Sequence, residues 1–413
     1  MRLMVILAAM AAFRLQAGLQ VSSVAQDPVS RLVRVEYRLS ESDAIVTLSA
    51  STNGVAVDDG AIVHVSGDVN RLVTADDNVK VICWRALADI PPFESDALTV
   101  SVRAWTKAHP PRYAVIDLRD GVPDDARVAY YAAAGALPDG GLTNDIYRTA
   151  KLALALVPAA GNTFVQGAPT TEADRVEGSK REAQRLVSFE NDFYMGVFPV
   201  TQDQHRRIRG SVPTGQKTSS SLAPVAQVKY NDLRGASSSS PKIDWPATGH
   251  SVSATSVLGE WREKTGIDFD LPTSAQWEYA CRAGCGDTWY WGGNHTTAGN
   301  DYDKIRAFAW CGDNCKSPQR VGGKGANAFG LYDMIGNVWE GCLDWGEAID
   351  LPSPGTALVE PAGSLSGTTR LWRGGPYSQG ASSLRAAKLN PRDPAQTGDG
   401  DGYRLVCSPS FKW

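Results

Sequence analysis

The sequence lacks long apolar segments, runs of basic residues and clustered histidines. The longest apolar stretch near its start, Leu3 to Phe13, is well short of the roughly 20 residues that cross a bilayer, so no segment is expected to span a membrane. Lys and Arg number 41 against 45 Asp and Glu, and the formal net charge of -4 leaves no electrostatic footprint for nucleic acid. With 40 Gly and 23 Pro in 413 residues, long helices should be few, and the length predicts two or three domains.

The first residues match the pattern of a secretory signal peptide. Arg2 precedes the apolar run, and a small-residue exit follows at Leu15-Gln16-Ala17. The sequence therefore predicts a signal peptide at residues 1–17 and export to the periplasm, the cell surface or the medium. A short buried helix or strand is the alternative, and Arg14 directly after the apolar run is less typical of a signal peptide.

The chain has seven cysteines, and an odd number leaves at least one thiol free or in an intermolecular bond. Two pairs, Cys281/Cys285 and Cys311/Cys315, share a Cys-x-x-x-Cys spacing, which in an exported protein would allow local disulfides. Zinc is the competing interpretation, but structural zinc sites more often use a two-residue spacing together with histidine. No histidine lies beside either pair, and Cys281 also fits the core of a helix.

Residues 28–108 are expected to form an all-β, immunoglobulin-like sandwich. Apolar and polar residues alternate in short runs such as Val33 to Tyr37 and Leu98 to Val102, and Asn-Gly, Asp-Gly or Pro-Pro pairs separate them. Residues 109–149 are rich in Gly, Asp and Pro, and they are expected to form a linker with one strand from Tyr113 to Leu118.

Residues 150–413 are expected to form a second, larger domain, which contains most of the tryptophans. Its clearest helix is predicted from Ser253 to Lys264, with Gly266 as the glycine that ends it. Another helix is predicted after Thr273, because Thr273-Ser274-Ala275-Gln276 is a capping box.

A series of ordered sequence blocks in this second domain carries a family resemblance. The blocks are Phe193–Gly196 followed by Pro199-Val200-Thr201, then Phe269–Ala280, Asn327–Glu340, Trp372–Gly375 and Gly402–Val406. Together they resemble the formylglycine-generating enzyme (sulfatase-modifying factor) domain family over about residues 150–407. The resemblance implies a C-type-lectin-like α+β fold with small sheets, two helices and much irregular loop, here preceded by the all-β sandwich.

The chain departs from the oxidases of this family at their copper site. Those enzymes bind copper through two cysteines shortly after the Arg-Gly-Gly block, and the corresponding positions here are Gln379 and Leu384. Neither side chain supplies a thiolate, so copper binding and formylglycine synthesis are not expected. The related iron-dependent sulfoxide synthases use clustered histidines, which this sequence lacks. The chain is therefore predicted to be no enzyme and to bind neither copper nor iron, with an enzyme of non-cysteine mechanism as the alternative.

Residues 376–401 resemble the mutated region of the variable proteins of diversity-generating retroelements, which use the same scaffold. The frame of that region is matched by Ala381, Ser382, Arg385, Ala387, Pro394 and Gly402. The candidate ligand-binding residues are Tyr377, Ser378, Gln379, Gly380, Ser383, Leu384, Lys388, Leu389, Asn390, Arg392, Asp393, Gln396, Thr397, Asp399 and Asp401. Tyrosine offers rigid amphipathic contact area, and the small polar residues offer adaptable hydrogen bonds.

The resemblance to the variable proteins implies a protein or carbohydrate ligand bound at this surface. A binding module of fixed specificity, for example for adhesion, and a plain loop rich in Gly, Asp and Pro are the alternatives.

A structural calcium ion is also implied by the family resemblance. Its ligands would be the carboxylates of Asp333 and Glu340 and the carbonyl groups of Gly336 and Val338. Mixed carboxylate and carbonyl oxygens suit a hard cation such as Ca²⁺. The alternative is that both carboxylates accept hydrogen bonds from loop amides, as buried carboxylates in a loop-rich fold must.

Overall fold

The computed structural model describes residues 16–90, 98–176, 180–235, 252–296, 299–347, 353, 355–364 and 366–409. Residues 1–15 of the expected signal peptide lie outside these ranges. The described residues divide into two compact units, the first within 16–117 and 122–147, and the second within 118–121 and 148–409. Among the described helices, none is both long and apolar enough to cross a bilayer.

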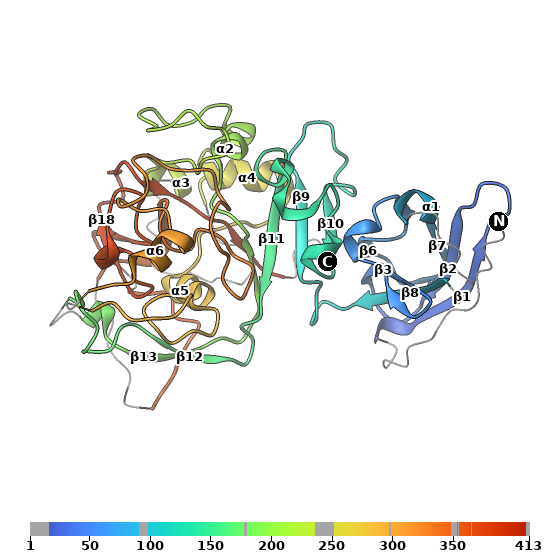
Figure 1. The fold of residues 1–413 in the computed structure, drawn as a ribbon, viewed down its shortest axis with the longest axis horizontal. Coiled ribbons are helices and arrows are strands. Elements are labelled where there is room, and N and C mark those ends of the chain that lie inside the picture. The colour runs from blue at the N-terminus through green and yellow to red at the C-terminus, as the bar shows by residue number, and fades with distance from the viewer. Residues whose placement is uncertain are drawn as a thin grey trace. The chain divides into compact units, whose positions relative to one another are not determined.

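The first unit is built mainly from antiparallel β-strands (Figure 1). One sheet has the order β1 (Leu19–Gln26), β2 (Val33–Leu39), β7 (Asp76–Trp84) and β5 (Val65–Gly67). The other contains β4 (Val55–Ala56), β3 (Ala44–Thr52), β6 (Arg71–Val73) and β8 (Leu98–Trp105), and α1 (Ala86–Asp89) is a single helical turn. Alternate residues of β2 are buried in one core with side chains of the other sheet, as the period-two pattern predicted.

The segment expected to be a linker contains more regular structure than one strand. The predicted strand is present as β9 (Tyr113–Asp117), and it pairs in antiparallel register with a further strand, β10 (Val128–Tyr131). Three 3₁₀ turns follow, at Ala134–Ala136, Gly141–Thr143 and Asp145–Arg148. Val128 and Tyr130, two residues apart on β10, are both buried. Removing these alternate apolar side chains from solvent stabilises β10 as a strand.

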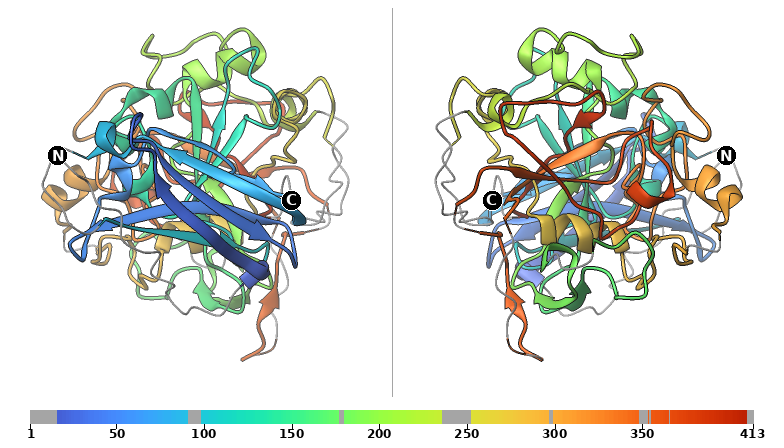
Figure 2. Two further views of the ribbon diagram at one scale, coloured as in Figure 1. Left: turned by 90° about the vertical axis from the view of Figure 1, so that its right-hand side faces the viewer. Right: turned by 90° about the vertical axis from the view of Figure 1, so that its left-hand side faces the viewer.

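The second unit is a mixed α+β structure with small sheets. Three neighbouring strands are β11 (Lys151–Val157), β14 (Phe193–Gly196) and β20 (Val406–Cys407), and a second sheet has the order β12 (Thr163–Gln166), β13 (Arg185–Ser188) and β16 (Leu358–Val359). A third sheet has the order β18 (Asn390–Arg392), β17 (Arg370–Arg373), β15 (Trp339–Trp345) and β19 (Asp401–Gly402). The helices are α2 (Gln202–Arg209), α3 (Tyr230–Arg234), α4 (Val257–Thr265), α5 (Ser274–Arg282) and α6 (Tyr302–Phe308). Both views of Figure 2 show how much irregular loop connects these short elements.

Both helices predicted in the second unit are present. Helix α4 begins later than expected, because Ser256 is its N-cap and accepts a hydrogen bond from the amide of Gly259. Gly266 ends it in the left-handed conformation, as predicted. Helix α5 begins with the predicted capping box, in which Thr273 and Gln276 exchange side-chain and backbone hydrogen bonds.

A buried carboxylate next to α5 should make stability depend on pH. Asp344 accepts the amide of Ser274 at 2.6 Å, and burial raises the pKa of Asp344 to about 6 from 3.8. Its stabilising contribution is complete below pH 3.8 and is lost as the pH rises through 6. We therefore expect Asp344→Asn to stabilise the second unit by about 1–3 kcal/mol at pH 7. The upper figure is the pKa shift of Asp344 converted at about 1.36 kcal/mol per pKa unit.

At pH 4 the same variant should differ little from the wild type, since the wild-type carboxyl is then protonated. Urea unfolding of both proteins at the two pH values measures the difference. An equal effect at pH 4 and pH 7 would contradict the assignment, because the change would then not involve ionisation of Asp344.

Candidate functional site

A pocket of about 430 Å³ lies in the second unit beside the third sheet. The candidate ligand-binding residues that line it are Gln379, Ser383, Lys388, Leu389, Asn390 and Arg392. The rest of its wall is Val176, Arg181, Glu182, Trp339 and Pro391. The structure thus gathers part of the predicted binding segment into one concavity.

One wall of the pocket is the edge of the third sheet. Strand β18 is the first in its order and pairs on one side with β17. Asn390 and Arg392 are the two ends of this three-residue strand, so their side chains project to the same side, and Lys388 stands two residues before Asn390. All three line the pocket.

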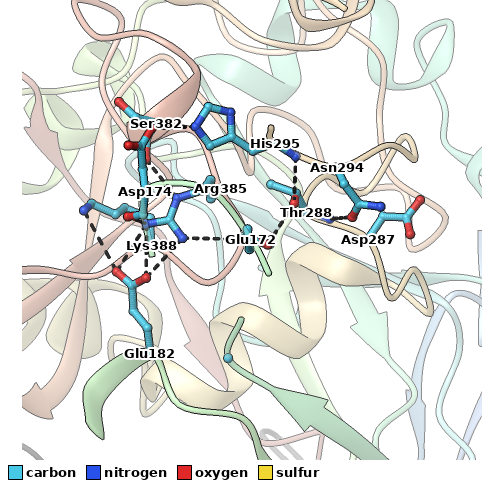
Figure 3. Close-up of polar contacts among 12 residues, drawn as sticks. Glu172, Asp174, Glu182, Asp287, Thr288, Asn294, His295, Ser382, Arg385 and Lys388 are labelled. Carbon is cyan, nitrogen blue, oxygen red and sulfur yellow. Dashed lines mark hydrogen bonds and ion pairs between the residues drawn. The ribbon is translucent and has the colours of Figure 1, made fainter. Parts of the chain in front are cut away.

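The segment that precedes this strand is fixed by the buried guanidinium of Arg385 (Figure 3). Its Nη1 lies 2.7 Å from Glu172 Oε1 and 3.1 Å from Glu182 Oε2, and its Nη2 donates to the Asp174 carbonyl at 2.9 Å. Arg385 itself is 0% exposed, and both glutamates are buried. The ion pairs therefore hold the 381–388 segment against Glu172 and Glu182, and Val176, Arg181 and Glu182 supply a further part of the pocket wall.

A second ion pair fixes the orientation of Arg392. Its Nε lies 2.8 Å from Asp401 Oδ2, which also accepts the amide of Gly398 at 2.7 Å. A Cβ at Gly398 would lie 2.9 Å from Arg392 Nη1, so the glycine leaves room for the guanidinium. Burial raises the pKa of Asp401 to about 6, although Arg392 acts in the opposite direction.

Comparison with known families accounts for this architecture. Residues 148–409, well over half of the chain, match the family described as Sulfatase-modifying factor enzyme 1-like domain. The chain belongs to this family. The domain boundaries agree with the second unit and with the resemblance seen in the sequence blocks.

Curated relatives of this chain align with it over only part of their length. The formylglycine-generating enzyme of Thermomonospora curvata is 31% identical over 154 residues, which are 34% of this chain and 49% of that enzyme. The serine/threonine-protein kinase pkn1 of Chlamydia caviae is 27% identical over 245 residues, which are 59% of this chain and 37% of the kinase. The chain thus spans half or less of the length of these relatives.

Solved structures with a similar arrangement include the Treponema denticola variable protein 1. That comparison has a TM-score of 0.47 at 20% identity and covers 63% of this chain and 96% of the other. PvdO from Pseudomonas aeruginosa gives a TM-score of 0.46 at 22% identity, with coverages of 62% and 94%.

The candidate ligand-binding residues of this sulfatase-modifying factor domain differ in their exposure to solvent. The exposed ones are Ser378, Gln379, Gly380, Asp393, Gln396 and Asp399, and the partly exposed ones are Ser383, Lys388, Asn390, Arg392 and Thr397. The buried ones are Tyr377, Leu384, Leu389 and Asp401. In the matched frame, Ala381, Arg385, Ala387 and Gly402 are buried.

The structure corrects the assignment of three candidates as surface contacts. Leu384 is 0% exposed, and Tyr377 is 4% exposed with its amide bonded to the Asn337 carbonyl at 2.8 Å. Asp401 is 0% exposed and orients Arg392 from behind. Leu389 is also buried but still lines the pocket. These side chains support the surface, because loop-rich folds must fill their interior with loop side chains as well.

The expected calcium ligands do not fit a cation. Both carboxylate oxygens of Glu340 face the buried Arg404 guanidinium, at 2.7 to 3.1 Å, and Trp277 Nε1 donates to Oε2 at 2.7 Å. The Asp333 carboxylate accepts a hydrogen bond from the backbone amide of Gly322 at 2.6 Å. The Gly336 carbonyl accepts one from the backbone amide of Val338. In the part of the chain that the structure describes, no three His, Cys, Asp or Glu side chains form a metal-binding group. The hydrogen-bonding alternative describes these contacts better.

Removing divalent cations should therefore leave the stability of the domain unchanged. We expect the unfolding temperature in EDTA and in millimolar calcium to agree within about 1 °C, since a bound ion at 100 times its Kd would add about 2.7 kcal/mol. Thermal unfolding followed by tryptophan fluorescence tests this. A calcium-dependent rise that Asp333→Asn abolishes would restore the calcium interpretation.

All seven cysteines are free thiols in the structure, so neither Cys-x-x-x-Cys pair forms a disulfide. Cys281 is buried in α5, as its place in the apolar pattern predicted. Cys315 Sγ lies 3.3 Å from the Cys311 carbonyl and 3.7 Å from the Tyr377 carbonyl. The Gly312 amide donates to the Gln379 carbonyl at 2.9 Å, so this turn supports the backbone of the binding segment.

The sequence did not reveal the pocket wall formed by Val176, Arg181 and Glu182. These residues precede the first recognised sequence block and show no motif of their own. Trp339 lies in the Asn327–Glu340 block, where the sequence alone did not distinguish a tryptophan of a binding surface from one that fills the core.

Proposed function

We propose that this chain is a non-catalytic ligand-binding protein whose contact surface is formed by residues 376–401. The exposure pattern carries the proposal: most candidate contact positions reach the surface, while Arg385 and other frame positions are buried. Exposed side chains such as those of Ser378 and Gln379 could change without disturbing the core. Such a surface suits a protein or carbohydrate ligand outside the cell, in keeping with the proposed signal peptide.

The finer part of the proposal is that a diversity-generating retroelement varies this surface. Sequencing the DNA beside the gene tests it directly. We expect a near-copy of the 376–401 coding segment that differs at adenines, together with a reverse transcriptase gene. Absence of both would favour a binding module of fixed specificity with the same fold.

An oxidase related to the formylglycine-generating enzymes is the second candidate, and sequence similarity to those enzymes supports it. The side chains at the two positions of their copper cysteines are the exposed amide of Gln379 and the buried aliphatic chain of Leu384. Neither binds a soft metal. Copper uptake, with oxygen consumption in the presence of a thiol-containing peptide, would support the oxidase over the binding protein.

Substitutions at the pocket should separate binding from folding. We expect Gln379→Ala and Lys388→Ala to weaken ligand binding by tenfold or more and to change the unfolding temperature by no more than a few degrees. Ligands would first be found on arrays of glycans and of surface proteins, and affinities then measured by surface plasmon resonance.

Lys304→Ala is a control for loss of a lysine outside the pocket, because Lys304 also lies 3.9 Å from one carboxylate, although its side chain is 62% exposed and that of Lys388 is 23% exposed. The control should bind like the wild type. If the pocket variants lose their fold instead, the segment is structural and the proposal fails.

A further inference from the structure

The pocket wall carries more positive than negative side chains. Arg181, Lys388 and Arg392 line it, against a single carboxylate, that of Glu182. Glu182 is already engaged by Arg385 from behind, at 3.1 Å from both Nη1 and Nη2. The nearby Asp174 carboxylate is bonded to His295 Nε2 at 2.6 Å. The acidic groups around the pocket are thus balanced by basic partners within the protein, and two of these partners, Lys388 at 3.9 Å from Glu182 and Arg392 at 2.8 Å from Asp401, also line the pocket. The charged part of the lining is three basic side chains and one carboxylate.

Several hydrogen-bond donors in the pocket have no partner among the described residues. Arg392 approaches Asp401 most closely through its Nε, and neither Nη atom of that guanidinium donates a hydrogen bond within the described ranges. The side-chain amides of Asn390 and Gln379 are likewise unpaired within the described ranges. Arg392 is also held in place by Asp401, so little rotamer freedom would be lost when it binds a ligand.

The spacing of these groups indicates the form of the ligand. Asn390 and Arg392 project to one side of β18 at an interval of two residues, about 6.6–6.8 Å in an extended chain, and Lys388, two residues before Asn390, lines the same pocket. An extended peptide has the same repeat, so acidic residues four positions apart would match Lys388 and Arg392, with a polar residue at Asn390 between them. Carboxylates bind guanidinium groups in a planar, bidentate geometry that two Nη donors can supply.

We propose that the pocket binds an extended acidic segment of a protein ligand, with two carboxylates contacted by Lys388 and Arg392. The inference rests on the proposed binding function and names the class of ligand. Val176, Arg181 and Glu182 lie outside residues 376–401, so the pocket would keep this part of its wall while Gln379, Lys388, Asn390 and Arg392 select the partner.

The test uses the full chain and two labelled peptides composed otherwise of Ser and Thr. One peptide has two glutamates four residues apart, and the other has glutamines at the same two positions. Fluorescence polarisation at low and high salt measures binding. We expect the glutamate peptide to bind at least tenfold more tightly than the glutamine peptide and to weaken with salt. Lys388→Gln and Arg392→Gln should each reduce that affinity by tenfold or more.

The controls are Lys304→Gln and Arg306→Gln on α6, where both side chains are exposed and paired with aspartates. They should bind the glutamate peptide normally. Equal binding of the two peptides, or binding of a sulfated oligosaccharide or inorganic phosphate without the glutamate peptide, would overturn the proposal. If an array-selected ligand is lost in Gln379→Ala but unaffected by Lys388→Gln and Arg392→Gln, the binding function stands and the acidic class fails.

Discussion

Replacing Arg385 with methionine is expected to destabilise the second unit by about 3–5 kcal/mol, the range for removing one partner of a buried ion pair. The substitution leaves Glu172 and Glu182 buried without their counter-charge, and it also removes the donor to the Asp174 carbonyl. Urea unfolding followed by tryptophan fluorescence measures the loss, because most tryptophans lie at or after Trp245. Ligand affinity should fall as well, since Arg385 holds two walls of the pocket together.

The matched control for this substitution is Arg306→Met. Arg306 forms two ion pairs, with Asp303 and Asp313, but its side chain is 46% exposed. Pairs of this kind are worth about 0–1 kcal/mol. Combining Arg385→Met with Glu172→Gln and Glu182→Gln should recover part of the stability, because no buried charge is then unpaired. A loss in Arg385→Met no larger than in Arg306→Met would show that the buried network does not hold the segment.

Local hydrogen bonding explains which parts of the fold could be predicted. The capping box of Thr273 and Gln276 depends on residues three apart, and so does the N-cap of Ser256. A glycine whose backbone adopts the left-handed conformation, such as Gly266, commonly ends a helix, and this signal is also local in the sequence. Strand β2 of the first unit could be predicted because one face of it is buried, which imposes a period of two.

Burial in the binding segment could not be predicted in the same way. Tyr377 and Leu384 lie in irregular loop, where no repeat distinguishes an inward from an outward side chain. The frame residue Arg385 was recognised from the family pattern, but its partners Glu172 and Glu182 lie 213 and 203 residues away in the sequence. Neither glutamate belongs to a motif, so the wall that they support became visible only in three dimensions.

The calcium ligand set that the family resemblance implies does not fit the structure for a related reason. Asp333 and Glu340 do lie in one block, and both are buried as a metal site requires. The positive charge that balances Glu340, however, comes from Arg404, 64 residues later in the chain. A sequence pattern identifies a buried carboxylate that needs a partner, and it does not distinguish a cation in solution from a distant guanidinium.

Replacing Glu340 with alanine should be as damaging as the loss of Arg385, at about 3–5 kcal/mol, because Arg404 would become a buried charge without a counter-ion. Both side chains are 0% exposed, and Glu340 also accepts the indole N–H of Trp277. Glu340→Gln should cost less, since its amide oxygen still accepts a hydrogen bond from Trp277. Urea unfolding of the two variants measures the difference between losing the charge and losing the whole side chain.

A double-mutant cycle separates this ion pair from the other contacts of Arg404. The guanidinium also donates to the carbonyl groups of Gly196, Val197 and Tyr332, and Arg404→Met removes those bonds whether or not Glu340 is present. These losses cancel in the cycle, so the coupling between Glu340→Gln and Arg404→Met reports the pair alone. We expect the double variant to be more stable than the sum of the single losses predicts, by at least about 1 kcal/mol. Additive losses would mean that the carbonyl contacts, rather than the charge of Glu340, hold Arg404 in the core.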